Sequence, residues 1–346
     1  MTQIQKSPWV PLKRDSLFNF AYVSSCICQN DHVFIAGISD AREGYVTLLN
    51  LKHKTWRELP HVPESVYIIS GIAILHDYLY VLASSYINQY SYRIDLSTCT
   101  RWEKMNTIDE MGRCPIVSNG NNRFQLEFLG SNQVYDPSVR DWIDFSAMKR
   151  KVHEFRVEVV AKKIYIIGGC IKKYTPLVQI YDIESRSWST GPDLPKVLKY
   201  FSTGIYRNRW IIVTGGMEDD TNEDNMKCFL FDIYSQKWTE SSILLTTSRK
   251  DHGCVVTREH LVLIGGYSGM RSESLPSIES IDISRLLPKW DSIGHYVLVR
   301  QLLDDGRASL IDEGTCATGS NDAVKNIMKI LDIDSFRTVL TFLIAK

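Results

Sequence analysis

Residues 164–188 read IYIIGGCIKKYTPLVQIYDIESRSW, and this stretch decides the fold. Its apolar run ends in Gly168-Gly169, the aromatic–aspartate pair Tyr181-Asp182 follows, and Trp188 closes the stretch. The apolar run lacks the alternation of a strand with one wet face, which indicates a strand covered on both faces. The glycine pair predicts a turn in which a Cβ has no room or φ is positive.

The same elements recur along the chain in the same order. Seven of the eight tryptophans stand at positions 9, 56, 102, 142, 188, 238 and 290, so the period is near 46 residues. The aromatic–aspartate pair returns as Tyr135-Asp136 and Phe231-Asp232, and the double glycine as Gly215-Gly216 and Gly265-Gly266. A period of this length exceeds a helical hairpin and matches one four-stranded blade of a β-propeller.

This combination resembles the kelch repeat, with a likeness that runs from about residue 7 to residue 290. The resemblance implies an all-β, kelch-type β-propeller of four-stranded antiparallel blades, and residues 1–346 are expected to form one domain. We expect a ring of seven blades, with six as the alternative. The last blade is expected to be degenerate and closed by an N-terminal strand at 7–12. The expected blades span 20–56, 67–102, 112–142, 153–188, 200–238, 251–290 and 295–335.

The repeated residues have physical roles that do not depend on the family name. The Tyr, Phe and Trp rings are large enough to fill the wedge that opens between neighbouring blades. The aspartate after the aromatic residue is expected to begin a turn, because its carboxylate can accept hydrogen bonds from nearby backbone amides.

Composition excludes several classes of protein. The 40 basic and 40 acidic side chains give no net charge, which argues against binding to the phosphate backbone of nucleic acid. The longest apolar run, 78–83, has six residues, far fewer than the ~20 that span a bilayer. The eight cysteines form no C-x-x-C pair, as expected for core thiols of a reducing compartment. We therefore expect a soluble cytoplasmic protein, monomeric by itself, with no nucleic-acid or membrane partner.

The sequence predicts no catalytic residue, no cofactor and no metal site. Kelch-type propellers include copper, iron and sugar enzymes, but none of the eight histidines forms a close pair with ligand spacing. His32, His76 and His260 precede equivalent strands and are interpreted as turn residues, and His252 as part of a strand opening. The alternative is a metal- or sugar-dependent enzyme whose site in the central channel is assembled from several blades.

The acidic stretch 218–224 invites comparison with a calcium loop. Asp220, Asn222 and Asp224 alternate as in the first half of such a loop, but Asn225 and Phe231 stand where glycine and glutamate are needed. We therefore interpret this stretch as a solvated loop.

Basic side chains gather in the connections between strands. In an up-and-down blade, the connection from strand d to the next strand a and the connection from strand b to strand c emerge at the same end. The candidate partner-binding residues in these connections are Arg113, Lys149, Arg150, Lys151, Lys172, Lys173, Arg249 and Arg271. Ordinary solvated loop charge is the plain alternative.

The resemblance implies peptide binding at this rim, with arginines taking carboxylates in bidentate fashion. We therefore expect a non-catalytic platform for a protein or acidic peptide, acting as a scaffold or as the substrate adaptor of a ubiquitin ligase. Because the 19 residues before Phe20 are too few for a BTB or F-box module, another chain is expected to supply the effector. Direct actin binding is a further possibility that the resemblance alone suggests.

Overall fold

The structure is a computed structural model. It describes residues 10–12, 23–29, 32–39, 43–63, 66, 68–75, 77–85, 88–105, 116–118, 126–128, 133–136, 141–144, 148–257, 259–275 and 277–287. The chain divides into two units, residues 1–286 and residues 287–346, and the second lies outside this range apart from Leu287. The expected blade at 295–335 therefore also lies outside it. No helix of the described residues has the length and apolar character needed to cross a membrane.

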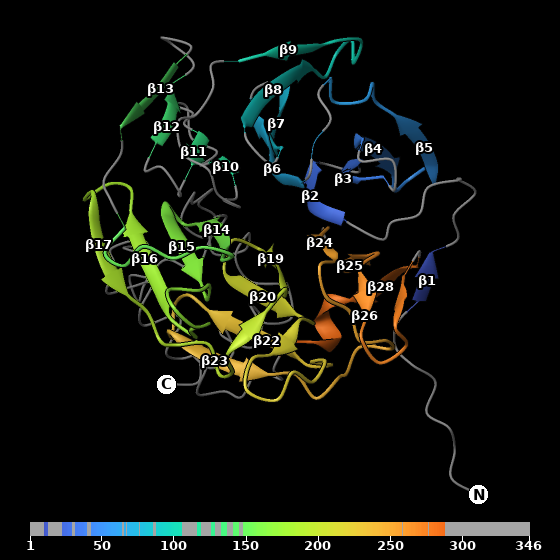
Figure 1. The fold of residues 1–346 in the computed structure, drawn as a ribbon. Helices are drawn as coiled ribbons and strands as arrows, with labels where there is room; N and C mark the ends of the chain where they lie inside the picture. Colours follow the sequence, from blue (N-terminus) through green and yellow to red (C-terminus); the bar gives the residue numbers. More distant parts are fainter. Residues whose placement is uncertain are drawn as a thin grey trace, which may run out of the picture. The chain divides into compact units, whose positions relative to one another are not determined.

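Of the described strands, 24 form six four-stranded antiparallel sheets, which we number as blades 1 to 6 (Figure 1). The other four form two two-stranded sheets, β18 (Leu198–Lys199) with β21 (Met217–Glu218) and β26 (Tyr267–Ser268) with β27 (Glu273–Ser274). Blades 1 to 3 are β2 (Val23–Gln29), β3 (His32–Ile38), β4 (Gly44–Asn50) and β5 (Thr55–Glu58); β6 (Ile68–Leu75), β7 (Tyr78–Ser84), β8 (Gln89–Asp95) and β9 (Trp102–Lys104); and β10 (Ile116–Ser118), β11 (Leu126–Phe128), β12 (Gln133–Asp136) and β13 (Asp141–Asp144). Blades 4 to 6 are β14 (Arg156–Val160), β15 (Lys163–Ile167), β16 (Val178–Asp182) and β17 (Ser187–Thr190); β19 (Ser202–Tyr206), β20 (Trp210–Thr214), β22 (Cys228–Asp232) and β23 (Lys237–Glu240); and β24 (Gly253–Val256), β25 (His260–Ile264), β28 (Ile278–Asp282) and β1 (Val10–Leu12).

The first strands of successive blades contact one another in cyclic order. Strand β2 contacts β6, β6 contacts β10, β10 contacts β14, and β14 contacts β19. Strand β19 then contacts β24, and β24 contacts β2, so the series returns to its start. This arrangement is an all-β propeller, as the sequence predicts.

The prediction for the N-terminal strand was right in kind and wrong in place. Strand β1 pairs with β28 in the register Val10↔Ser280 and Leu12↔Ile278, so it completes blade 6 and not a seventh blade. After β28 the chain enters a short 3-10 helix, Ile283–Arg285, instead of turning back at once into a fourth strand. The outer edge of β28 is therefore covered by β1, a strand that precedes blade 1 in the sequence.

The glycine pairs adopt the backbone conformation that the sequence predicts. In all three pairs both residues have positive φ, between 60° at Gly215 and 98° at Gly169. A Cβ added at Gly216 would lie 2.7 Å from the carbonyl oxygen of Lys199 and 2.8 Å from the Cβ of Phe201. Only glycine combines this positive φ with such a close approach of neighbouring backbone.

The aromatic residues pair across strands at the predicted offset. Tyr181 lies opposite Trp188 with ring centroids 5.0 Å apart, and Phe231 lies opposite Trp238 at 4.9 Å. The aspartate that follows each aromatic residue begins a turn, since Asp182 Oδ1 accepts hydrogen bonds from the amides of residues 184 and 185. The predicted role of this aspartate in a turn is thus confirmed.

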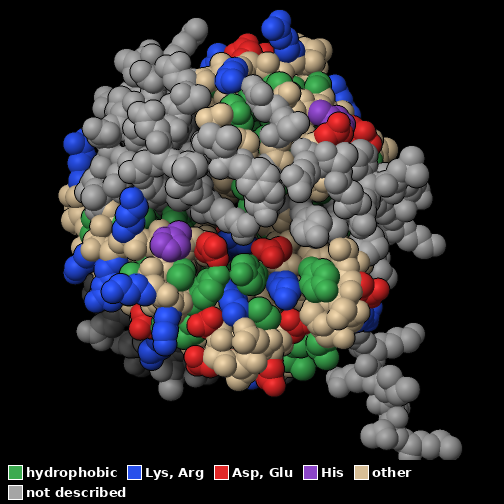
Figure 2. Space-filling model, viewed as in Figure 1, with side chains coloured by type: hydrophobic (Ala, Val, Ile, Leu, Met, Phe, Trp, Pro, Cys, Tyr) green, Lys and Arg blue, Asp and Glu red, His purple; other side chains and the backbone are tan. Residues whose placement is uncertain are grey.

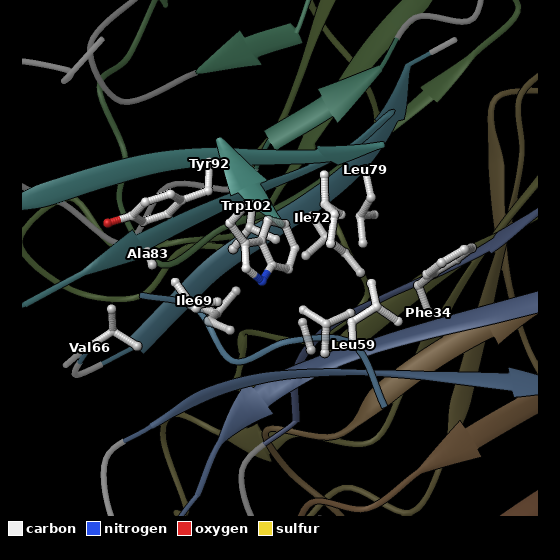
Figure 3. Close-up of a cluster of buried hydrophobic side chains, with 14 of the residues drawn as sticks. Phe34, Leu59, Val66, Ile69, Ile72, Leu79, Ala83, Tyr92 and Trp102 are labelled. Atoms are coloured by element: carbon white, nitrogen blue, oxygen red, sulfur yellow. The ribbon is translucent and has the colours of Figure 1, made fainter. Parts of the chain in front are cut away.

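Two of the outer tryptophans, Trp102 and Trp238, also anchor their blades to the segments that enter them. Trp102 Nε1 donates to the carbonyl oxygen of Pro60 at 2.7 Å, and Trp238 Nε1 donates to that of Pro192 at 3.0 Å. Figure 3 shows the Trp102 ring among side chains that include Leu59, from the segment between blades 1 and 2. The Trp102 indole therefore fills the space between two blades, and its hydrogen bond to Pro60 holds the segment that enters blade 2.

Candidate functional site

Two connections of blade 4 lie edge to edge and form what we call the blade 4 rim, residues 148–155 and 168–177. The amide of His153 donates to the carbonyl of Cys170 at 3.1 Å, and the amide of Cys170 donates back to His153 at 2.7 Å. Behind them the buried amide of Gln179 holds the backbone of Arg150, accepting from its N–H at 2.7 Å and donating to its carbonyl at 2.8 Å. The loops that carry the basic residues are thereby held by the framework of the blade.

Five of the predicted partner-binding residues are exposed on the blade 4 rim. They are Lys149, Arg150, Lys151, Lys172 and Lys173. Within the described part of the chain, no carboxylate lies at ion-pair distance from Lys149, Arg150, Lys172 or Lys173. The bridge between His153 and Cys170 brings the basic residues 149–151 close to the basic residues 172–173 on one blade.

The prediction that Arg249 contacts a partner was wrong. Its side chain is fully buried, and its guanidinium donates to the carbonyl of Gly265 at 2.9 Å, to Ser277 Oγ at 3.2 Å and to Glu279 at 2.9 Å. Burial lowers the pKa of Arg249, and the charge of Glu279 acts in the opposite direction. Arg249, which precedes β24, therefore ties the entry segment of blade 6 to the end of β25 and to β28. Arg271 is exposed beside Glu273, and Arg113 lies outside the described residues.

Lysines of the segment between β17 and β19 neutralise part of the acidic stretch 218–224. Lys196 pairs with Glu218, and Lys199 Nζ lies 3.3 Å from Asp219 Oδ1. Asp220 and Glu223 remain exposed. Blade 5 thus uses much of its negative charge internally, whereas blade 4 leaves positive charge available.

Asp224, the last residue of the acidic stretch, has a structural role. Its Oδ2 accepts hydrogen bonds from Ser248 Oγ at 2.6 Å and from the amide of Met270 at 2.9 Å, which ties blade 5 to blade 6. Among the residues that the structure describes, no group of three His, Cys, Asp or Glu side chains could hold a metal ion.

Two titratable side chains of the innermost region have shifted pKa values. Burial raises the pKa of Glu158, on β14, to about 7, although Thr203 on β19 and the charge of Arg156 oppose the shift. Burial, together with the charges of Arg249 and Arg156, lowers the pKa of His252 well below its ordinary value. His252 Nε2 lies 2.9 Å from Thr214 Oγ1, so this histidine belongs to the packed interior.

Sequence reasoning missed the apolar component of the rim. The described residues include three exposed large hydrophobic side chains: Ile171 is 41% exposed, Leu244 52% and Met270 74%. All three lie in connections at the rim, and none belongs to the repeated pattern of glycine, aromatic residue and tryptophan. The one sign of this in the sequence is that these apolar residues lie in loops between the patterned strands. The face shown in Figure 2 carries hydrophobic and basic side chains close together.

Comparison with known proteins agrees with this architecture. The family model described as the kelch motif matches residues 152–195 and 248–286. The chain is 25% identical over 167 residues to the kelch-like protein terF of Aspergillus terreus, a match that covers 44% of this chain and 36% of that protein. It is 23% identical over 232 residues to the human kelch repeat and BTB domain-containing protein 12, covering 58% of this chain and 36% of that protein.

The chain thus spans 36% of the length of each of these two curated relatives. Among solved structures it resembles YjhT with a TM-score of 0.59 and 17% identity, over 74% of this chain and 94% of YjhT, which supports the propeller fold. The two matched motifs coincide with blade 4 and with β24, β25 and β28 of blade 6. Together with these relatives, they show that the chain is a kelch-repeat protein.

Proposed function

We propose that this chain is a non-catalytic platform that binds a protein or an acidic peptide at the rim formed by its d–a and b–c connections. The observation that carries the proposal is the blade 4 rim, where five basic side chains are exposed on two loops that are held together by backbone hydrogen bonds. Short loops on a rigid framework suit recognition, because little conformational entropy is lost on binding.

The distribution of charge supports an acidic partner. Glu218 and Asp219 already have lysine partners, and the side chain of Glu154 accepts a hydrogen bond from Tyr174, so these carboxylates compete little for the blade 4 lysines. Basic side chains without local partners attract carboxylates and raise the rate of encounter with an acidic surface.

Within this proposal the ring has six blades and the protein is cytoplasmic. The contact of β24 with β2 supports six blades, since it places the last described blade beside the first. The cysteines at positions 99, 170, 228 and 254 are free thiols, which supports a reducing compartment. The role of scaffold or substrate adaptor follows the kelch resemblance.

The test is an affinity pull-down from cells that uses, as bait, a variant of this protein with the rim charge reversed. In the test variant, Lys149, Arg150, Lys172 and Lys173 are changed to Glu. In the matched control, four exposed basic residues at the opposite ends of the blades are changed to Glu: Lys52, Lys54, Arg186 and Lys237. We expect bound proteins to be lost from the rim variant and kept by the control. Retention of the same partners by both variants would remove the proposal.

One observation favours the competing enzyme reading. Glu158 has a pKa of about 7 and lies on an innermost strand next to Arg156, as a general acid or base in a central channel would. Metal analysis of the purified protein distinguishes a metal-dependent enzyme from a non-catalytic platform. Stoichiometric copper or iron would favour the enzyme over the platform.

A further inference from the structure

A row of half-buried aromatic, thioether and lysine side chains crosses the rim from blade 4 to blade 6. We call it the aromatic–lysine row; its members are Tyr174, Lys199, Tyr200, Met217, Lys250 and Tyr267. None of the six belongs to the predicted basic set or to the repeat pattern. The row extends the site of the proposed function, and the inference below rests on that function.

The row begins where blade 4 meets blade 5. The rings of Tyr174 and Tyr200 meet edge to face, with centroids 6.2 Å apart. Lys199 Nζ lies 5.6 Å from the centroid of Tyr174, and Lys199 pairs with Met217 in the two-stranded sheet β18 (Leu198–Lys199) and β21 (Met217–Glu218). Two aromatic rings, an ammonium group and a thioether are therefore neighbours across the boundary of two blades.

The row continues without a break into blade 6. Lys250 Nζ lies 3.9 Å from Met217 Sδ and 5.3 Å from the centroid of Tyr267. Lys250 and Tyr267 exchange backbone hydrogen bonds of 3.0 and 2.9 Å. Exposed Ile171 and Met270 lie close in sequence to the two ends of the row, on blades 4 and 6. Apolar and basic groups alternate along it.

The charges along the row differ in their availability. Lys199 is engaged by Asp219 and by Asn222 Oδ1, at 3.3 and 2.7 Å. Lys250, by contrast, has no carboxylate at ion-pair distance among the described residues. Its ammonium group lies against a ring and a sulfur atom, which hold it in place without neutralising it.

We infer that the aromatic–lysine row binds an extended segment of a partner protein in which acidic and apolar residues alternate at every second position. In an extended chain, residues i and i+2 point to the same side about 6.6 Å apart. Three spacings between neighbouring groups of the row, 5.3 to 6.2 Å, are close to this value, while Lys250 Nζ and Met217 Sδ lie closer together, at 3.9 Å. Rigid rings and a thioether bury apolar side chains at low entropic cost, while Lys250 and the blade 4 lysines take the carboxylates.

Fluorescence anisotropy with three labelled peptides of 12 residues tests this inference. The probe repeats Glu-Ser-Leu-Ser three times; one control peptide has Ser in place of Leu, and the other has Lys in place of Glu. We expect the probe to bind about tenfold more tightly than either control peptide. Equal binding of the probe and the peptide without Leu would overturn the inference, yet would leave the proposed function standing if that binding needs Lys149, Arg150, Lys172 and Lys173.

Variants of the protein locate the binding. Met217→Ser with Tyr267→Ser is expected to weaken the probe about tenfold. The matched control, Tyr78→Ser with Tyr234→Ser at the opposite ends of the blades, is expected to leave it unchanged. If the double rim variant melts early, Lys250→Glu replaces it and is expected to weaken the probe and strengthen the peptide that carries Lys. An unchanged affinity in these rim variants, or no binding of the probe to the wild-type protein, would overturn the inference.

Discussion

Replacing Arg249 by alanine should destabilise the propeller rather than weaken a binding surface. The guanidinium is fully buried, and the substitution removes its hydrogen bonds to the Gly265 carbonyl, to Ser277 and to Glu279. Glu279, whose side chain is 12% exposed, would then keep its charge without its partner.

The size of the effect follows from that geometry. Removing one member of a buried ion pair costs about 3–5 kcal/mol, because the remaining charge is left uncompensated. With an unfolding entropy of about 2.1 cal/mol/K per residue, the unit of residues 1–286 unfolds with about 0.6 kcal/mol/K. The loss therefore corresponds to a decrease in Tm of about 5–8 °C.

Thermal unfolding followed by circular dichroism measures this decrease. The matched control is Lys250→Ala, which changes the neighbouring residue on the rim and should alter the free energy of unfolding by less than about 1 kcal/mol. The double variant Arg249→Met with Glu279→Met should recover much of the loss, since an apolar pair can replace a buried ion pair. A Tm of Arg249→Ala within about 1 °C of wild type would refute the reasoning.

Three other perturbations test separate features of the fold. Gly216→Ala should lower the free energy of unfolding by about 1–3 kcal/mol in urea denaturation, because φ is +84° and the new Cβ would lie 2.7 Å from a backbone oxygen. The control, Gly191→Ala, places a Cβ near side-chain carbons only and should cost less; equal costs would contradict this. Because the pKa of Glu158 is raised from 4.5 to about 7, the folded state binds its proton more tightly, and this group's contribution to stability is full below pH 4.5 and is lost as the pH rises through 7, by at most about 1.4 kcal/mol per pH unit. Glu158→Gln should remove that loss. The difference in urea midpoint between this variant and the wild-type protein should therefore change between pH 5 and pH 7.5, and an unchanged difference would refute the prediction. Deletion of residues 1–13 should expose the edge of β28, lower Tm and promote self-association in size-exclusion chromatography; a monomer of wild-type Tm would show that β1 contributes nothing.

The features that the sequence predicted are those that each repeat determines locally. The positive φ of Gly168-Gly169, the turn begun by Asp182 and the pairing of Tyr181 with Trp188 depend on residues within one blade. Because the same short pattern recurs several times, chance likeness could be separated from a true repeat.

The features that the sequence did not predict depend on residues far apart. Arg249 was placed on the surface because a charged residue in a loop is usually solvated, and its burial depends on Glu279, 30 residues further on. Strand β1 has three residues, too few to carry a signal for its pairing with β28. The aromatic–lysine row needs three blades side by side, so no single repeat contains it.

The pairing of β1 with β28 has a consequence for biosynthesis. Val10 leaves the ribosome before its partner Ser280 is made, about 270 residues later. During translation the earlier blades can complete all four strands in turn, while blade 6 is completed by β1, a strand that is synthesised before blade 1. A nascent chain of this protein should therefore hold an unsatisfied β-edge until late, and that interval is when a chaperone would be most useful to it.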